Sequence, residues 1–227
     1  MPDFIDDLIA ARAVVKEGEA PEPLGGGYVV IQPIDGYRFG SDALWLARFA
    51  GSNIARGAEA LDLCSGCGVI GMLLCIEKEA HVIGAELDEA LCDMSNRASY
   101  ANNIDARFIN VNLNSTEIRD VLGYHLYDAV VCNPPYFKAE SKHTKIAPHA
   151  NSELTIDFER IAFVASNALK MGGKFFFTHT LTRLDEIICT CVDHDLRIKK
   201  LVINKSRKTF GAMCTLGGKA GMTVEVE

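Results

Sequence analysis

The feature that most constrains the fold is a regular alternation of two hydrophobic patterns from Ala60 onward. Short apolar runs are typical of buried strands, and they read A-L-D-L, H-V-I-G-A-E-L, A-R-F-I-N-V, Y-D-A-V-V-C, K-F-F-F-T-H and I-K-K-L-V-I. Stretches with helical periodicity separate these runs, at residues 69–79, 88–102, 115–122, 157–171 and 182–194. This alternation predicts βαβ units, and therefore an α/β fold with a mostly parallel sheet that helices cover on both faces. Two further strand-like segments, residues 209–215 and 222–226, predict a hairpin at a sheet edge.

The N-terminal part of the chain departs from this alternation. Residues 3–16 have the periodicity of a short amphipathic helix, and the Gly- and Pro-rich segment 17–27 predicts a linker or turn. Residues 28–33 and 36–39, separated by Ile-Asp, predict a β-hairpin. Ser41 follows this hairpin in a position to cap the next helix.

Length and composition are those of one α/β domain with an appendage, or of two small domains. The chain has 227 residues, of which 48% are apolar, so it can bury a full core. It has no run of roughly 18 apolar residues, and its first residues, M-P-D-F-I-D-D, are acidic. We therefore expect neither a transmembrane helix nor a signal peptide, and we expect a cytoplasmic protein. The eight cysteines lie mostly in apolar runs, as reduced, buried thiols do.

Charge is distributed unevenly along the chain. The net charge is −7, but residues 1–137 hold 9 Lys and Arg against 20 Asp and Glu, whereas residues 138–227 hold 14 against 10. A basic patch on one face can bind phosphate groups despite a negative total. Ordinary solvated lysines are the alternative interpretation of the same residues.

A glycine-rich segment, C-S-G-C-G-V-I-G at residues 64–71, follows a predicted strand and opens a predicted helix. Its Gly66 and Gly68 let the backbone approach a ligand closely, and N–H groups at the helix N-terminus then face that ligand. Glu86 ends the next predicted strand, 20 residues after Gly66, where its carboxylate can accept both hydroxyls of a ribose. The segment predicts a nucleotide-binding loop, and it leaves NAD and S-adenosylmethionine both open.

Cys64 and Cys67 form a C-x-x-C within the same segment, which raises a metal site or a redox dithiol as alternatives. A structural zinc site needs four ligands, and the nearest candidate pair, Cys189 and Cys191, lies far along the chain with its thiols splayed. The six histidines show no metal-ligand spacing, so we predict no metal. A redox dithiol before a helix stays open as an alternative.

The motif N-P-P-Y at residues 133–136 favours S-adenosylmethionine over NAD as the ligand of the glycine loop. It ends an apolar strand, and ligands bind at the carboxyl ends of parallel strands. Pro134 and Pro135 fix the backbone and remove two N–H donors, so Asn133 Oδ1 and the Pro134 carbonyl form an acceptor-rich corner. Tyr136 offers a face on which a flat group can stack. This corner suits a planar amine or amide as the nucleophile, and the alternative is a rigid turn that merely leaves the sheet.

These motifs resemble those of the class I S-adenosylmethionine-dependent methyltransferases that carry N-P-P-Y, which methylate adenine N6 or the amide nitrogen of glutamine. The chain is most similar to the bacterial tRNA (adenine-N6)-methyltransferase family that acts on an anticodon-loop adenine of valine tRNA. The residues that carry this resemblance are G-Y-R-F-G-S-D-A-L-W-L-A at 36–47, the glycine loop, N-P-P-Y-F, Pro148-His149, and L-K-M-G-G-K-F-F-F-T-H at 169–179.

The resemblance implies a Rossmann-like fold with a seven-stranded sheet and helices on both faces. Residues 1–55 would form an N-terminal helix, a hairpin and a cofactor-covering segment, and residues 56–227 would form the methyltransferase domain. The implied cofactor is S-adenosyl-L-methionine, and the residues expected to bind it are Arg38, Phe39, Asp62, Cys64, Ser65, Gly66, Gly68, Glu86, Leu87, Asn112, Leu113 and Asn133.

The resemblance also implies catalytic and substrate-binding residues. The expected catalytic set is Asn133, Pro134, Pro135 and Tyr136. The expected substrate-binding set is Tyr136, Phe137, Lys138, Lys142, Lys145 and His149. The chain departs from the family at Cys64 and Cys67, where Gly or Ala is usual, at Asn112, which replaces an acidic residue, and at Ala150, which replaces a glutamate.

The predicted function is methylation of adenine N6 in RNA, with an anticodon-loop adenine of tRNA as the target base flipped out onto Tyr136. Lys199, Lys200, Lys205, Arg207 and Lys208 are further candidates for phosphate contact. The alternatives are a protein glutamine N5-methyltransferase acting on release factors, a DNA adenine N6-methyltransferase, a non-catalytic RNA-binding module and a dehydrogenase. We expect tRNA or another structured RNA as the partner, no membrane association, and a monomer or weak homodimer.

Overall fold

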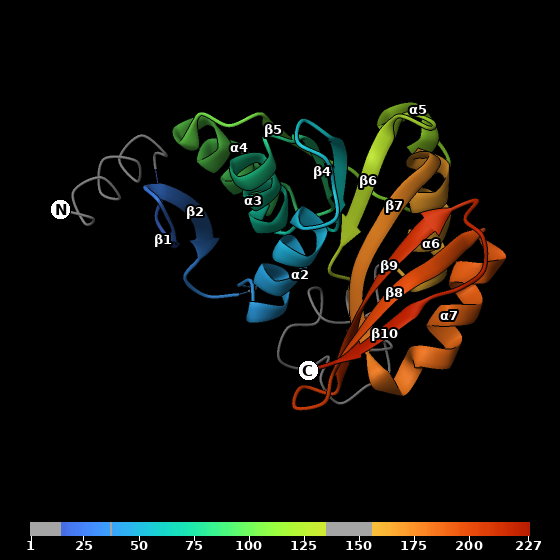
Figure 1. Ribbon diagram of the computed structural model, residues 1–227. Coiled ribbons are helices and arrows are strands. Elements are labelled where there is room, and N and C mark those ends of the chain that lie inside the picture. Colours follow the sequence, from blue (N-terminus) through green and yellow to red (C-terminus); the bar gives the residue numbers. More distant parts are fainter. Residues whose placement is uncertain (1–14, 37, 135–155) are drawn as a thin grey trace.

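A computed structural model describes residues 15–36, 38–134 and 156–227. Its centre is an eight-stranded sheet with the order β10-β8-β9-β7-β6-β3-β4-β5 (Figure 1). These strands are β3 (Glu59–Leu63), β4 (His81–Glu86), β5 (Ala106–Asn110), β6 (Tyr127–Cys132), β7 (Leu169–Thr180), β8 (Leu196–Asn204), β9 (Thr209–Leu216) and β10 (Thr223–Val226). Only β9 runs antiparallel to its neighbours, β7 and β8. The Rossmann-like, mostly parallel sheet predicted from the sequence is therefore confirmed.

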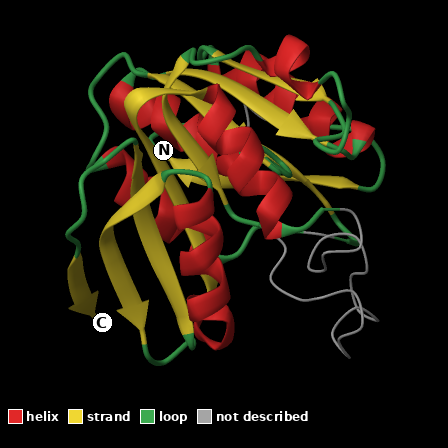
Figure 2. Ribbon diagram, turned by 90° about the vertical axis from the view of Figure 1, so that its right-hand side faces the viewer, coloured by secondary structure: helices red, strands yellow, loops and turns green. Residues whose placement is uncertain are grey.

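Helices cover both faces of this sheet (Figure 2). One layer consists of α2 (Ser41–Gly51), α3 (Val69–Lys78) and α4 (Glu89–Asn102). The other consists of α5 (Ile118–Leu122), α6 (Phe158–Ala168) and α7 (Leu184–Asp193), the last preceded by a short 3₁₀ turn, η2 (Leu181–Arg183). None of the helices in these described ranges has the length and hydropathy that crossing a membrane requires.

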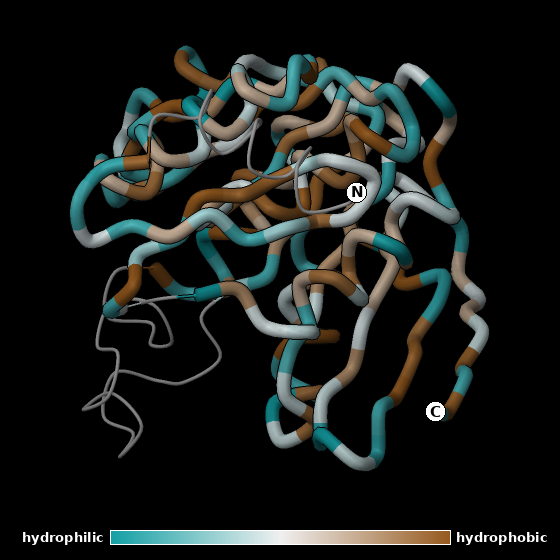
Figure 3. Tube along the Cα trace, turned by 90° about the vertical axis from the view of Figure 1, so that its left-hand side faces the viewer, coloured by the Kyte–Doolittle hydropathy of each residue, from teal (hydrophilic) through white to brown (hydrophobic). Residues whose placement is uncertain are grey.

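The central strands of the sheet are apolar at successive positions because they bury both of their faces. Val131 and Phe176 pack in the hydrophobic cluster under α2, α3 and α4, whereas Val130 and Phe177 pack in the cluster under α5, α6 and α7. Hydrophobic residues accordingly run along the inner strands, and polar residues predominate on the outer turns (Figure 3). This two-sided burial is the physical reason that the strands read as continuous apolar runs.

A separate two-stranded sheet flanks α4. Its strands are β1 (Glu19–Gly25) and β2 (Tyr28–Pro33), and they are antiparallel. The side chain of Asn102 joins them to α4, because its Oδ1 accepts from the Val29 N–H at 2.9 Å and its Nδ2 donates to the Val29 carbonyl at 2.7 Å. Val30 and Ile31 share the hydrophobic cluster of α2 and α3. The boundary between an N-terminal segment, residues 1–55, and a methyltransferase domain, residues 56–227, stays a prediction.

Five predictions about local structure were wrong. The segment 17–27 is not a linker, because it contains β1, and it is β1 rather than residues 36–39 that pairs with β2. Ser41 is the first residue of α2 and makes no cap bond; Gly40 is the capping residue. The sheet has eight strands rather than seven. Residues 209–215 and 222–226 form no hairpin, because β10 pairs in parallel with β8 at the sheet edge. The expected N-terminal helix at 3–16 lies mostly outside the described residues.

Candidate active site at the carboxyl edge of the sheet

The glycine loop joins β3 to α3 and is held by hydrogen bonds with two other elements, β4 and α4. The Ser65 N–H donates to the Ala85 carbonyl at 3.1 Å, and the Gly66 N–H donates to Glu86 Oε2 at 2.7 Å. From α4, the Ser95 hydroxyl donates to the Gly66 carbonyl at 3.1 Å. The loop is therefore a fixed cradle rather than a free connection.

Phe108 on β5 explains why this cradle needs glycines. A Cβ at Gly68 would lie 2.5 Å from Phe108 Cζ, and a Cβ at Gly84 on β4 would collide with the same ring. Gly68 also has a φ of +77°, which L side chains rarely adopt. A Cβ at Gly71 would lie 2.8 Å from Val82 Cγ1, so this third glycine allows α3 to pack closely on the sheet.

Two buried polar atoms at the loop lack hydrogen-bond partners among the described residues. They are Asp62 Oδ1 and Ser65 Oγ. Asp62 is fully buried, and its Oδ2 accepts from the Gly71 N–H at 3.0 Å. The pKa of the Asp62 carboxyl is raised from 3.8 to about 7, mainly because the group is buried; the hydrogen bond from the Gly71 N–H opposes this shift, and the nearby Glu86 carboxylate adds to it. Buried polar atoms without partners are costly, so their presence here is what a site for a polar ligand predicts.

Glu86 ends β4 beside the loop, where the sequence predicts it. Its Oε1 accepts from the Asp88 N–H at 2.9 Å, and burial raises the pKa of its carboxyl. Each carboxylate oxygen has a second lone pair for an external hydroxyl. Asn110 supports this strand end by donating to the Leu87 carbonyl at 2.8 Å, and the Leu87 side chain itself is exposed.

Asn112 and Leu113 follow β5 at the same edge. Asn112 Oδ1 accepts from the Asn114 N–H at 2.9 Å, so the acceptor oxygen expected to meet an adenine amino group is also used in a local turn. Leu113 is buried, and its carbonyl accepts from Arg160 Nε at 2.6 Å.

Asn133 and Pro134 follow β6, which lies directly beside β3 in the sheet. The hydroxyl of Thr178 on β7 donates to Asn133 Oδ1 at 2.6 Å. Sequence reasoning missed Thr178, because no local motif joins it to a residue 45 positions away. Of the remaining predicted catalytic and substrate-binding residues, those at 135–138, 142, 145 and 149 lie outside the described residues.

Arg38 and Phe39, the two residues expected to cover the cofactor, point to different parts of the molecule. The Phe39 N–H donates to Gln32 Oε1 at 3.0 Å and also interacts with the Cys67 thiol, so Phe39 lies against the glycine loop. Arg38 instead directs its guanidinium to Glu22 Oε2 at 2.7 Å and to the Pro33 carbonyl at 3.4 Å. Arg38 thus connects this segment to β1 and β2.

The two cysteines of the loop are both free thiols, Cys64 partly buried and Cys67 buried. The Cys64 thiol interacts with the buried Cys132 thiol on β6, and the Cys64 backbone has a φ of 55°, in the left-handed region. Cys67 is buried, and this burial raises the pKa of its thiol to about 12. Among the described residues, no group of three or more His, Cys, Asp or Glu side chains is placed to hold a metal ion.

The fold and the glycine cradle define a Rossmann-like methyltransferase architecture, and solved structures share it. A methyltransferase from Pyrococcus furiosus superposes with a TM-score of 0.65 at 16% identity, covering 86% of this chain and 92% of that one. A predicted O-methyltransferase from Agrobacterium tumefaciens superposes with a TM-score of 0.61 at 20% identity, covering 82% and 85%.

Residues 39–182 match the family model described as methyltransferase small domain, and the chain belongs to this family. A tRNA1(Val) (adenine(37)-N6)-methyltransferase from Pedobacter heparinus is 30% identical over 157 residues, which cover 66% of this chain and 63% of the relative. A protein of the same name from Aeromonas salmonicida is 25% identical over 187 residues, covering 80% and 77%. The chain thus aligns with less than two thirds of the first relative's length.

Proposed function

We propose that this protein is an S-adenosylmethionine-dependent methyltransferase that methylates the N6 amino group of adenine in RNA, with an anticodon-loop adenine of tRNA as the target. The observation that carries the proposal is the placement of Asn133. Its side-chain oxygen is held by Thr178 at the end of β6, directly beside the strand that leads into the glycine loop. A fixed acceptor next to a cofactor cradle is what a planar amine needs for methylation.

The described residues fit the cofactor on two counts. The glycine cradle offers backbone N–H groups without side chains in the way, and Asp62 Oδ1 and Ser65 Oγ are buried polar atoms that lack a partner among the described residues. Ser65, Gly66 and Gly68 would hold the methionine part, Glu86 would accept from the ribose hydroxyls, and Asn112 would meet the adenine. Asp62 would support the loop from behind. When bound, S-adenosylmethionine supplies an electrophilic methyl group.

Asn133 would orient the target amine. The lone pair of an exocyclic adenine nitrogen is delocalised into the ring, so the nitrogen is a weak nucleophile. Acceptors on its two hydrogens, supplied by Asn133 Oδ1 and the Pro134 carbonyl, would draw it toward a tetrahedral geometry and raise its electron density. Because Thr178 donates a hydrogen bond to Asn133 Oδ1, the amide would be held in position before the target amine binds.

Adenine in tRNA is favoured over the other targets by the relatives. Those in Pedobacter heparinus and Aeromonas salmonicida carry the name of a tRNA adenine-37 N6-methyltransferase, and the same corner would otherwise also accept a glutamine amide. With tRNA as the substrate, we propose that the enzyme acts in the cytoplasm. A monomer or weak homodimer suffices, because one chain supplies the whole cradle and Asn133.

The test is transfer of a labelled methyl group to total tRNA from a strain that lacks the gene, followed by digestion and separation of the nucleosides. The wild type should label N6-methyladenosine. Asn133→Ala should abolish the label, and calorimetry should show that the variant still binds S-adenosylhomocysteine through the glycine loop and Glu86, even without the cofactor contact expected from Asn133. Equal labelling by Asn133→Ala would show that the acceptor at β6 does not orient the target.

A further inference from the structure

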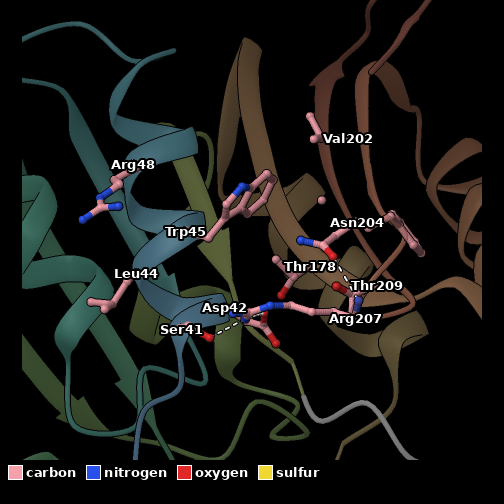
Figure 4. Close-up of a pocket in the computed structure, with 12 residues that line it drawn as sticks. Ser41, Asp42, Leu44, Trp45, Arg48, Thr178, Val202, Asn204, Arg207 and Thr209 are labelled. Atoms are coloured by element: carbon pink, nitrogen blue, oxygen red, sulfur yellow. Dashed lines mark hydrogen bonds and ion pairs between the residues drawn. The ribbon is translucent and has the colours of Figure 1, made fainter. Parts of the chain in front are cut away.

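A cavity of about 270 Å³ lies between α2 and the strands β7, β8 and β9 (Figure 4). Its walls combine aromatic and polar groups. They come from α2, from the carboxyl end of β7, from β8 and β9 and from the turn between these two strands, and they include Asp42, Trp45, Thr178, Asn204, Arg207 and Thr209. A space of this size, with a flat apolar wall and several hydrogen-bonding groups, suits one heteroaromatic ring better than an extended chain.

Thr178 connects this cavity to the proposed reaction. It lines the cavity, and its hydroxyl donates to Asn133 Oδ1. In the sheet order, β3 with its glycine loop lies on one side of β6, and β7, β9 and β8 lie on the other. The cavity is therefore separated by β6, the strand that Asn133 follows, from the strand that leads into the cofactor cradle. Its occupant is a neighbour of the methylated group rather than that group.

Trp45 provides the flat wall. One face of its ring stacks on Phe49, with the centroids 4.9 Å apart and the planes 24° apart. The ring reaches from α2 over Gly211 of β9, where any Cβ would collide with it. Figure 4 shows the indole extending from α2 toward these strands. Aromatic side chains held in this way are platforms on which nucleobases stack.

Arg207 provides a positive charge at the same cavity. Its Nη1 donates to Asp42 Oδ1 at 2.7 Å and to Ser41 Oγ, and its side chain is 44% exposed. Its turn is fixed because Asn204 Oδ1 accepts from the Arg207 N–H at 3.0 Å. A guanidinium has five N–H donors, so the ion pair with Asp42 leaves donors that a phosphate can use.

We propose that this cavity binds a nucleotide of the substrate RNA adjacent to the target adenine, with its base on Trp45 and its phosphate at Arg207. The proposal rests on the proposed function, since it names a recognition subsite of the same enzyme. It makes the bases around the target, and not only the adenine, determinants of substrate choice.

Trp45 is the only tryptophan in the chain, so its fluorescence reports on this cavity directly. The probe is an unmodified anticodon stem-loop RNA of a valine tRNA, together with versions that are abasic at one position on either side of the target. The intact RNA should quench Trp45, and one abasic flanking position should remove most of the quenching. Anisotropy of end-labelled RNA measures binding independently of the tryptophan.

Charge-matched variants test the phosphate contact. Arg207→Gln should weaken RNA binding about tenfold. Arg56→Gln, which removes a similar exposed ion pair with Glu79 at the far end of α3, should change binding by less than about twofold. Equal thermal midpoints for the two variants would show that both are folded.

The outcomes distinguish this proposal from the function on which it rests. Methylation of the RNA without any change in Trp45 fluorescence would overturn the subsite and leave the function standing. Base-dependent quenching without N6-methyladenosine would support the subsite and overturn the function. Quenching that is the same for every abasic RNA, or that DNA of the same sequence produces equally, would overturn the subsite.

Discussion

Gly68→Ala tests the steric basis of the cofactor cradle. Two costs are expected. The alanine must adopt the φ of +77° of this position, which costs about 1–2 kcal/mol. Its Cβ would also lie 2.5 Å from Phe108 Cζ, and such overpacking of a core costs roughly 1–3 kcal/mol more. The free energy of unfolding should therefore fall by about 2–5 kcal/mol. Because relief of the clash displaces the loop, the affinity for S-adenosylhomocysteine should also fall, by at least about tenfold.

Gly57→Ala is the matched control, because Gly57 has a φ of +70° and nothing within 4 Å of an added Cβ. It should lose only the backbone cost of about 1–2 kcal/mol and keep full cofactor affinity. Urea denaturation and calorimetry measure the two quantities. In a Phe108→Leu background, the excess cost of Gly68→Ala should shrink by about 1 kcal/mol. If Gly68→Ala costs no more than Gly57→Ala, Phe108 does not shape the loop.

Three other predictions follow from single residues. Thr178→Val should lower kcat about tenfold with cofactor affinity unchanged, whereas Thr178→Ser, which keeps the hydroxyl, should retain most of the wild-type kcat. An equal loss of kcat in both variants would show that Thr178 does not act through its hydroxyl on Asn133. The folded-state pKa of Asp62, about 7, is raised above its ordinary 3.8, so its contribution to stability is present at low pH and is lost as pH rises through 7. Asp62→Asn should thus gain stability relative to wild type from about pH 4 to about pH 7, measured by urea denaturation, and a constant difference would refute this. The Cys67 thiol, with a pKa of about 12, should resist iodoacetamide in the native protein and react on unfolding; rapid native labelling would revive the redox alternative.

The sheet could be predicted from sequence because its central strands bury both faces. Each continuous apolar run marks a strand of the parallel part, and the helical stretches between them match α3, α4, α6 and α7 to within a few residues. β1 was missed because Pro21 and Pro23 mimic a linker, whereas a two-stranded edge tolerates residues without N–H donors. The pairing of β10 with β8 is a long-range choice that no local pattern encodes.

The candidate site was predictable where it depends on position along strands. Gly66, Glu86 and Asn133 all follow or end strands at the carboxyl edge, and that edge brings them together. Partners that act across the sheet were not predictable. The roles of Phe108 beneath the glycines and of Thr178 beside Asn133 arise only when β5 and β7 take their places.

The proposed reaction is tested most directly by a competition in one tube. Purified protein and methyl-labelled S-adenosylmethionine are incubated with unmodified valine tRNA, double-stranded DNA and a release factor together, and each product is separated and hydrolysed. The label should appear in N6-methyladenosine from the tRNA, at adenine in the anticodon loop. Label in N5-methylglutamine from the release factor, or in N6-methyldeoxyadenosine from the DNA, would contradict the assignment of RNA as the substrate of this enzyme.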